Sequence, residues 1–167
     1  MLGSRAPLRS DNCALLFHRL REGVLTLDPA VEGMRRPTDG TVVWGALMEI
    51  GMTEGTATVV SLADGTTSLY TSAGGGLVGG GAHRVVVAAT RHFLSVVGAH
   101  LDTFDEDSER APVPESGRVT FRALTYVGRR YLDLSEKDLC EPGHAFSALY
   151  QAGHEVVARL RLVNARD

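Results

Sequence analysis

The dipeptide Asp64-Gly65 separates two segments, 56–63 and 66–72, that are rich in Val, Thr, Leu and Tyr. These residue types favour strands, and an Asp-Gly pair readily adopts the positive φ angles of a two-residue type I′ turn. The sequence therefore predicts an antiparallel hairpin at this point. The preceding segment 41–50 is also β-rich, so we expect three strands in a meander.

A second hairpin is predicted nearer the C-terminus, where segment 118–126 is followed by a turn at Gly128 and by the returning segment 129–134. Side chains of the first segment alternate between two faces, as in a strand. Val119, Phe121 and Ala123 share one face, and Thr120, Arg122 and Leu124 share the other.

Three segments carry apolar residues at helical spacing. The first is expected to begin with Asn12 as its N-cap and is short; the second spans 82–102, and the third runs from Ser147 to Leu162. The apolar positions of the first are Leu15, Leu16, Leu20 and Val24, and those of the second are Val85, Ala89, Phe93, Val96, Val97 and Leu101. The expected buried side of the third consists of Leu149, Tyr150, Gly153, Val156, Val157 and Leu160.

Hairpins without a regular strand–helix–strand alternation indicate an antiparallel sheet with helices gathered against it. We therefore predict an α+β fold with an about five-stranded, mainly antiparallel sheet, two long helices packed on one face and a short N-terminal helix. Residues 1–11 are expected to form a flexible arm, and residues 12–167 a single domain.

Composition excludes several classes of protein. The formal net charge is −3, whereas nucleic-acid binders usually present a basic surface. Cys13 and Cys140 are too few for a disulfide framework, and no apolar run reaches the roughly 20 residues of a membrane span. We expect a cytoplasmic protein that binds neither membrane nor nucleic acid, and its preference for Arg over Lys is typical of GC-rich bacterial genomes.

A glycine cluster offers one place for ligand chemistry. Residues 74–79 match G-x-G-x-x-G, and free backbone amides beside a helix N-terminus can bind a phosphate. The preceding hairpin is the wrong context for a dinucleotide fold, and the lack of a following Lys-Ser/Thr excludes a P-loop. The candidate residues for an anion cradle or an interface loop are Gly74, Gly75, Gly76, Gly79, Gly80, Gly81 and Arg84. Tight turns and close packing, within the chain or against a second copy of it, explain the same glycines and are the favoured interpretation.

Other candidate groups are scattered along the sequence. Six histidines show no zinc-binding spacing, so we predict no metal site and no cofactor. Cys140 precedes His144 by four residues, which permits either a reactive thiol or an ordinary small apolar residue. Glu49 lies within an apolar strand and must be either paired or turned outward.

The order of elements across residues 12–162, namely a short helix, a meander, a long helix, a hairpin and a last long helix, resembles roadblock/profilin-like domains. The chain departs from them in having three strands before the middle helix, where roadblock domains usually have two, and two rather than three after it. That resemblance implies a dimeric, non-catalytic scaffold. The leading hypothesis is therefore a protein-interaction or regulatory module that forms a homodimer, with the loop 74–81 at or near the contact. The alternative is a small-molecule or anion (phosphate or nucleotide) binder that uses the same loop, and an enzyme is the third hypothesis.

Overall fold

The computed structural model describes residues 8–165, with side chains from residue 12 onward. The strands form one sheet in the spatial order β4-β3-β2-β1-β6-β7-β5, and every neighbouring pair is antiparallel. The strands are β1 (Val43–Met52), β2 (Gly55–Leu62), β3 (Thr67–Thr71), β4 (Gly76–Leu77), β5 (Asp105–Glu106), β6 (Arg118–Thr125) and β7 (Gly128–Ser135). The helices are α1 (Leu8–Leu25), α2 (Arg84–Ala99), α3 (Glu136–Leu139) and α4 (Ser147–Asn164), with short 3₁₀ turns η1 (Gly80–Ala82) and η2 (Leu101–Thr103).

The α+β class and the antiparallel sheet are confirmed, but the described part of the sheet has seven strands rather than about five. The two additional strands, β4 and β5, lie at the two edges and have two residues each. A strand of two residues has no alternation that a sequence pattern could reveal.

The chain reversal at Asp64-Gly65 is confirmed, because β2 and β3 are antiparallel neighbours. The turn is not the predicted type I′, which needs positive φ at both central residues. Gly65 has a φ of 94°, whereas Asp64 does not have a positive φ. The amide of Leu62 donates to the carbonyl of Thr66 (2.9 Å), so the loop is one residue longer than predicted and uses glycine only at its last position.

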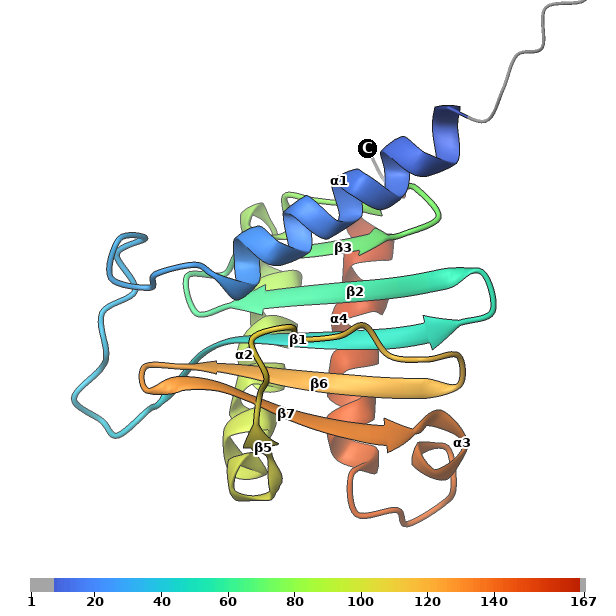
Figure 1. Cartoon of the computed structure of the whole chain (residues 1–167). Coiled ribbons are helices and arrows are strands. Elements are labelled where there is room, and N and C mark those ends of the chain that lie inside the picture. Colours follow the sequence, from blue (N-terminus) through green and yellow to red (C-terminus); the bar gives the residue numbers. More distant parts are fainter. Residues whose placement is uncertain (1–7, 166–167) are drawn as a thin grey trace, which may run out of the picture.

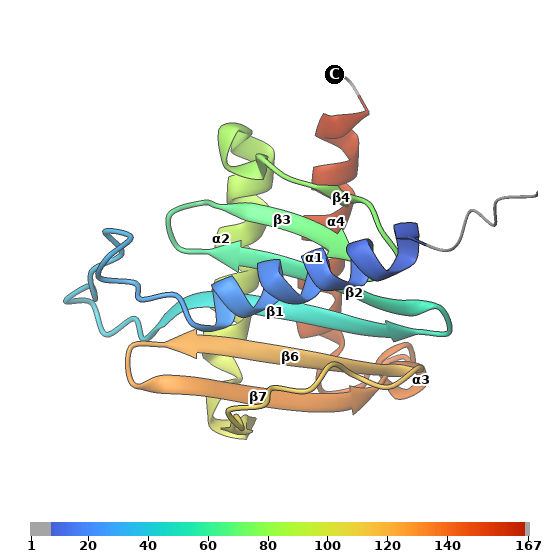
Figure 2. The ribbon, with the colours of Figure 1, turned by 45° about the horizontal axis from the view of Figure 1, so that its top comes forward.

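The sheet is covered on both faces (Figure 1). Helices α2 and α4 cross one face, as predicted for the two long helices, while α1 and the segment 107–117 lie over the opposite face (Figures 1 and 2). Helix α1 has 18 residues, as many as α4, so it is not the short helix that we predicted. It begins at Leu8 rather than at Asn12; residues 1–7 of the predicted arm lie outside the described residues.

The two faces of the sheet have separate hydrophobic cores. The predicted alternation of β6 is confirmed: Val119, Phe121 and Ala123 belong to the core beneath α2 and α4. Leu124, on the other face of β6, belongs to the second core together with Phe17 of α1. Strand β6 is buried on both faces and includes polar residues, among them Arg122, which is 1% exposed. A buried polar side chain must find hydrogen-bond partners inside the protein.

The range predicted for the last helix is close to that of α4. In α2 the predicted apolar face is partly wrong, because Val85 is exposed and the next residue, Val86, is buried. Within the described residues, no helix is both long and apolar enough to cross a membrane.

Candidate interaction surface

The glycine cluster follows β3 and leads through β4 and η1 into α2. Gly74 and Gly75 have φ angles of 109° and 87°, which side chains rarely allow, and they form the turn between β3 and β4. The side chain of Thr71 donates to the carbonyl of Gly74 (2.6 Å), and its amide donates to the carbonyl of Gly75 (3.1 Å). These two glycines are therefore explained by turn geometry.

Other glycines of the cluster are explained by close packing. A Cβ atom on Gly76 would lie 2.8 Å from the carbonyl oxygen of Leu69, and one on Gly80 would lie 2.8 Å from the side chain of Leu160. A Cβ atom on Gly81 would lie 3.2 Å from the carbonyl oxygen of Gly65. The loop is thus fitted tightly against the sheet edge and α4.

Several backbone amides near the proposed anion cradle already donate hydrogen bonds to carbonyls of the protein. The amide of Gly74 donates to the carbonyl of Thr71, and the amide of His83 donates to the carbonyl of Gly80. Arg84 is the first residue of α2 and is exposed, with no ion pair to any residue that the structure describes. No observation favours an anion at this loop, so the cradle stays a prediction.

The structure places the glycine loop beside α1, which the sequence did not predict. An apolar hollow of about 290 Å³ lies between them. Its lining residues are Cys13, Leu16, Phe17 and Leu20 from α1, Tyr70 and Thr71 from β3, and Gly74, Gly75, Gly76 and Val78 from the loop.

Large apolar side chains around this hollow are exposed. Leu16 and Leu20 of α1 are 58% and 44% exposed, and Val78 of the loop is 73% exposed. Leu15 is 51% exposed but does not line the hollow. We call Leu16, Leu20 and Val78, together with Gly74–Gly76 between them, the α1–glycine surface. Exposed apolar side chains gathered around an apolar hollow are typical of a place where another molecule binds.

The exposed leucines are three of the four apolar positions that predicted α1 from the sequence. The residues that α1 buries most fully are instead Phe17, which is 2% exposed, and Arg21, which is 6% exposed. Phe17 and Arg21 are one helical turn apart and so point in the same direction. An arginine on the buried face gave no apolar signal, and this is why the sequence pattern missed the orientation of the helix.

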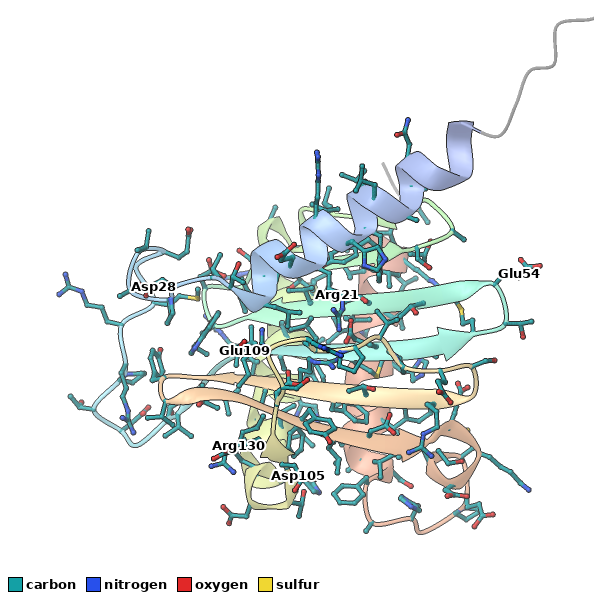
Figure 3. All side chains as sticks on the ribbon, in the orientation of Figure 1. Arg21, Asp28, Glu54, Asp105, Glu109 and Arg130 are labelled. Atoms are coloured by element: carbon teal, nitrogen blue, oxygen red, sulfur yellow. The ribbon has the colours of Figure 1, made fainter. Side chains whose placement is uncertain are left out.

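Arg21 lies between α1 and the middle of the sheet, where it meets a fully buried carboxylate (Figure 3). Its Nε donates to Oε1 of Glu49 (2.6 Å) and its Nη2 donates to Oε2 (2.8 Å). The hydroxyl of Thr58 also donates to Oε1 of Glu49 (3.0 Å). Nη1 of Arg122, from the adjacent strand β6, donates to Oε2. Glu49 is therefore paired rather than turned outward, which decides between the two alternatives that the sequence left open for this residue.

The same network holds the segment that precedes β6. Nε of Arg122 donates to Oδ2 of Asp107 (3.0 Å), and its Nη2 donates to the carbonyl of Pro112 (2.8 Å). Nη2 of Arg21 also donates to the carbonyl of Ala111 (2.5 Å). The network thus joins α1, three strands and this segment at one point.

Each carboxylate of the network is engaged by an arginine, and Arg122 is bonded at Nε, Nη1 and Nη2. A buried charge is tolerated when it is paired and hydrogen-bonded in this way. The arrangement anchors a helix and a loop, and it fixes the position of the α1–glycine surface from beneath.

Two other sequence candidates are not brought into a catalytic arrangement by the contacts of the described residues. Cys140 is exposed, and Nδ1 of His144 accepts a hydrogen bond from the amide of Phe146 (3.2 Å). Cys13 is also a free thiol. Across residues 8–165, no group of three or more His, Cys, Asp and Glu side chains is placed to hold a metal ion.

Comparison with known proteins gave no relative: no family model, curated protein or solved structure matches this chain. The resemblance to roadblock/profilin-like domains therefore stays a prediction from the order of elements.

Proposed function

We propose that this chain is a non-catalytic protein-interaction module that forms a homodimer through the α1–glycine surface. The observation that carries the proposal is the exposure of Leu16 and Leu20, beside Val78, on a helix that Arg21 anchors to the sheet. Burial of apolar area of this kind is the main driving force for association.

A second copy of the chain suits this surface. In a twofold dimer the same patch is present on both partners, so two α1 helices that cross antiparallel bring leucine against leucine. The charged residues beside the leucines, Arg19 and Glu22, have opposite signs, so the two copies do not meet with like charge alone. Val78 adds a further apolar side chain next to α1.

A non-catalytic role is supported by the chemistry of the buried groups. Glu49 and Asp107 are the carboxylates that the fold buries under α1 and the adjoining segment, and both are paired with arginines. A general acid or base, in contrast, must reach a substrate with the group that transfers the proton.

The test is the molar mass in solution, measured by size-exclusion chromatography with light scattering at several concentrations. The wild-type protein is expected to be a dimer, and the double variant Leu16→Glu/Leu20→Glu a monomer. Both substitutions are at exposed positions, so the variant should keep the circular dichroism spectrum and unfolding midpoint of a folded domain.

Val127→Glu is the matched control, because Val127 is 76% exposed but lies in the turn between β6 and β7. This variant is expected to remain a dimer. A monomeric wild-type protein at tens of micromolar, or a Leu16→Glu/Leu20→Glu variant that is still dimeric, would refute the proposal.

A further inference from the structure

A second cavity lies on the opposite face of the sheet from α1, beside α4. It has a volume of about 500 Å³, within the range of about 300–1,000 Å³ that is usual for small-molecule sites. Its apolar wall is formed by side chains of β1, β2, β3 and α4: Ile50, Ala57, Val59, Leu69 and Val157. Part of the apolar sheet surface is therefore accessible next to the helix that covers the rest.

His154 of α4 contributes its imidazole ring to the wall of this cavity. The rings of Tyr150 and His154 pack edge to face, with centroids 4.4 Å apart and planes at 81°. Burial disfavours the charged form of His154 and so lowers its pKa. The Nε2 atom is buried without a hydrogen-bond partner among the described residues, so a ligand in the cavity contacts the ring and not this atom.

Arg161 contributes a positive charge to the same cavity. It is seven residues after His154, or about two helical turns, so both side chains lie on one side of α4. Arg161 is exposed and forms no ion pair with any residue in the described range 12–165. Guanidinium groups of this kind bind carboxylates with matching geometry.

Glu136 limits the charge of a ligand. It lines the cavity and accepts a hydrogen bond from the hydroxyl of Tyr150 (2.8 Å). It is bonded at Tyr150, eleven residues before Arg161 and about 16 Å away along α4. Its negative charge disfavours acidic groups at that end of the cavity, so the cavity suits one carboxylate at Arg161 and not a polyanion such as a nucleotide.

We propose that this cavity binds an amphipathic monocarboxylate, with its apolar body against Ile50, Val59 and Leu69 and its carboxylate on the guanidinium group of Arg161. The site is on the other face of the molecule from the α1–glycine surface, so this inference does not depend on the dimer.

The test uses octanoate, with 1-octanol as a ligand of the same chain length without the charge, in isothermal titration calorimetry. Octanoate is expected to bind one molecule per chain, at least 10-fold more tightly than octanol. Arg161→Ala should weaken octanoate binding about 10-fold and leave octanol binding unchanged, since a charge-assisted hydrogen bond is lost. Addition of octanoate should also shift the imidazole NMR signals of His154.

Arg159→Ala is the matched control, because Arg159 lies on the same helix but is paired with Glu155 (2.6 Å). It is expected to bind octanoate like the wild-type protein. The proposal is overturned if octanoate does not bind saturably, if octanol binds equally well, or if the two arginine variants behave alike.

Discussion

Arg21 of α1 and Glu49 of β1 form a two-point ion pair inside the protein, at 2.6 Å and 2.8 Å. The pair connects residues that are 28 positions apart in the chain. It determines which side of α1 faces the sheet and, as a consequence, which leucines of α1 remain exposed.

Replacing Glu49 with glutamine should destabilise the protein strongly. The substitution leaves the buried guanidinium group of Arg21 without a compensating charge and Arg122 with Asp107 alone, and breaking a buried pair costs about 3–5 kcal/mol. Urea unfolding of the variant measures the loss. The control is Glu155→Gln, whose exposed pair with Arg159 should contribute less than about 1 kcal/mol. Equal losses in the two variants would contradict a structural role for the network.

Two tyrosines should respond in opposite ways to the removal of their hydroxyl groups. The hydroxyl of Tyr70 is buried without a hydrogen-bond partner among the described residues, and burial raises its pKa so that it stays protonated. Tyr70→Phe should therefore stabilise the fold by about 1 kcal/mol, while Tyr150→Phe, which loses the bond to Glu136, should destabilise it by about 1 kcal/mol. Thermal and urea unfolding of both variants measure these changes, and destabilisation by Tyr70→Phe would show that its hydroxyl is bonded.

Alanine substitutions at two helix glycines should also have opposite effects on stability. Gly153 of α4 faces Met48 of β1, and a Cβ atom at this position would lie 2.9 Å from Cε of Met48 and closer still to its Sδ. Gly153→Ala should destabilise the protein by about 1–3 kcal/mol through overpacking. Gly98 of α2 has nothing closer than 4.0 Å, so Gly98→Ala should stabilise the helix by up to about 1 kcal/mol. If both variants are stabilised, α4 does not pack as closely on β1 as described.

The stability of the fold should depend on pH through His154. Burial is the main cause that lowers the pKa of its imidazole below 6.5; Glu136 raises this pKa and Arg161 lowers it. The unfolded chain then binds more protons than the folded one just below pH 6.5, so stability is fully present above that pH. It is lost progressively as the pH falls from about 6.5 through the folded-state pKa.

NMR titration of the His154 ring measures that pKa directly. Urea unfolding between pH 4.5 and 8 should show a smaller pH dependence for His154→Gln than for the wild-type protein. A ring that titrates at or above 6.5 would contradict the burial of its Nε2 atom.

Several parts of the fold could be predicted because the signals are local. The reversal at Asp64-Gly65 needs only neighbouring residues, and the alternation across 118–126 assigns side chains to two faces without knowledge of what covers them. The location of the glycine loop after a hairpin was predictable for the same reason. Its contact with α1 was not, since the two segments are separated by β1, β2 and β3.

The sequence by itself determined the main chain reversals, the five longer strands, the approximate places of the three long helices, and that the sheet is antiparallel, because those properties depend on residues close together in the chain. Tertiary structure decided which side of α1 is buried. An arginine enters the interior only where a carboxylate is already placed to receive it, and Glu49 also accepts from Arg122, a residue 73 positions away. The exposed leucines follow from that long-range pairing, and no periodicity within α1 specifies it.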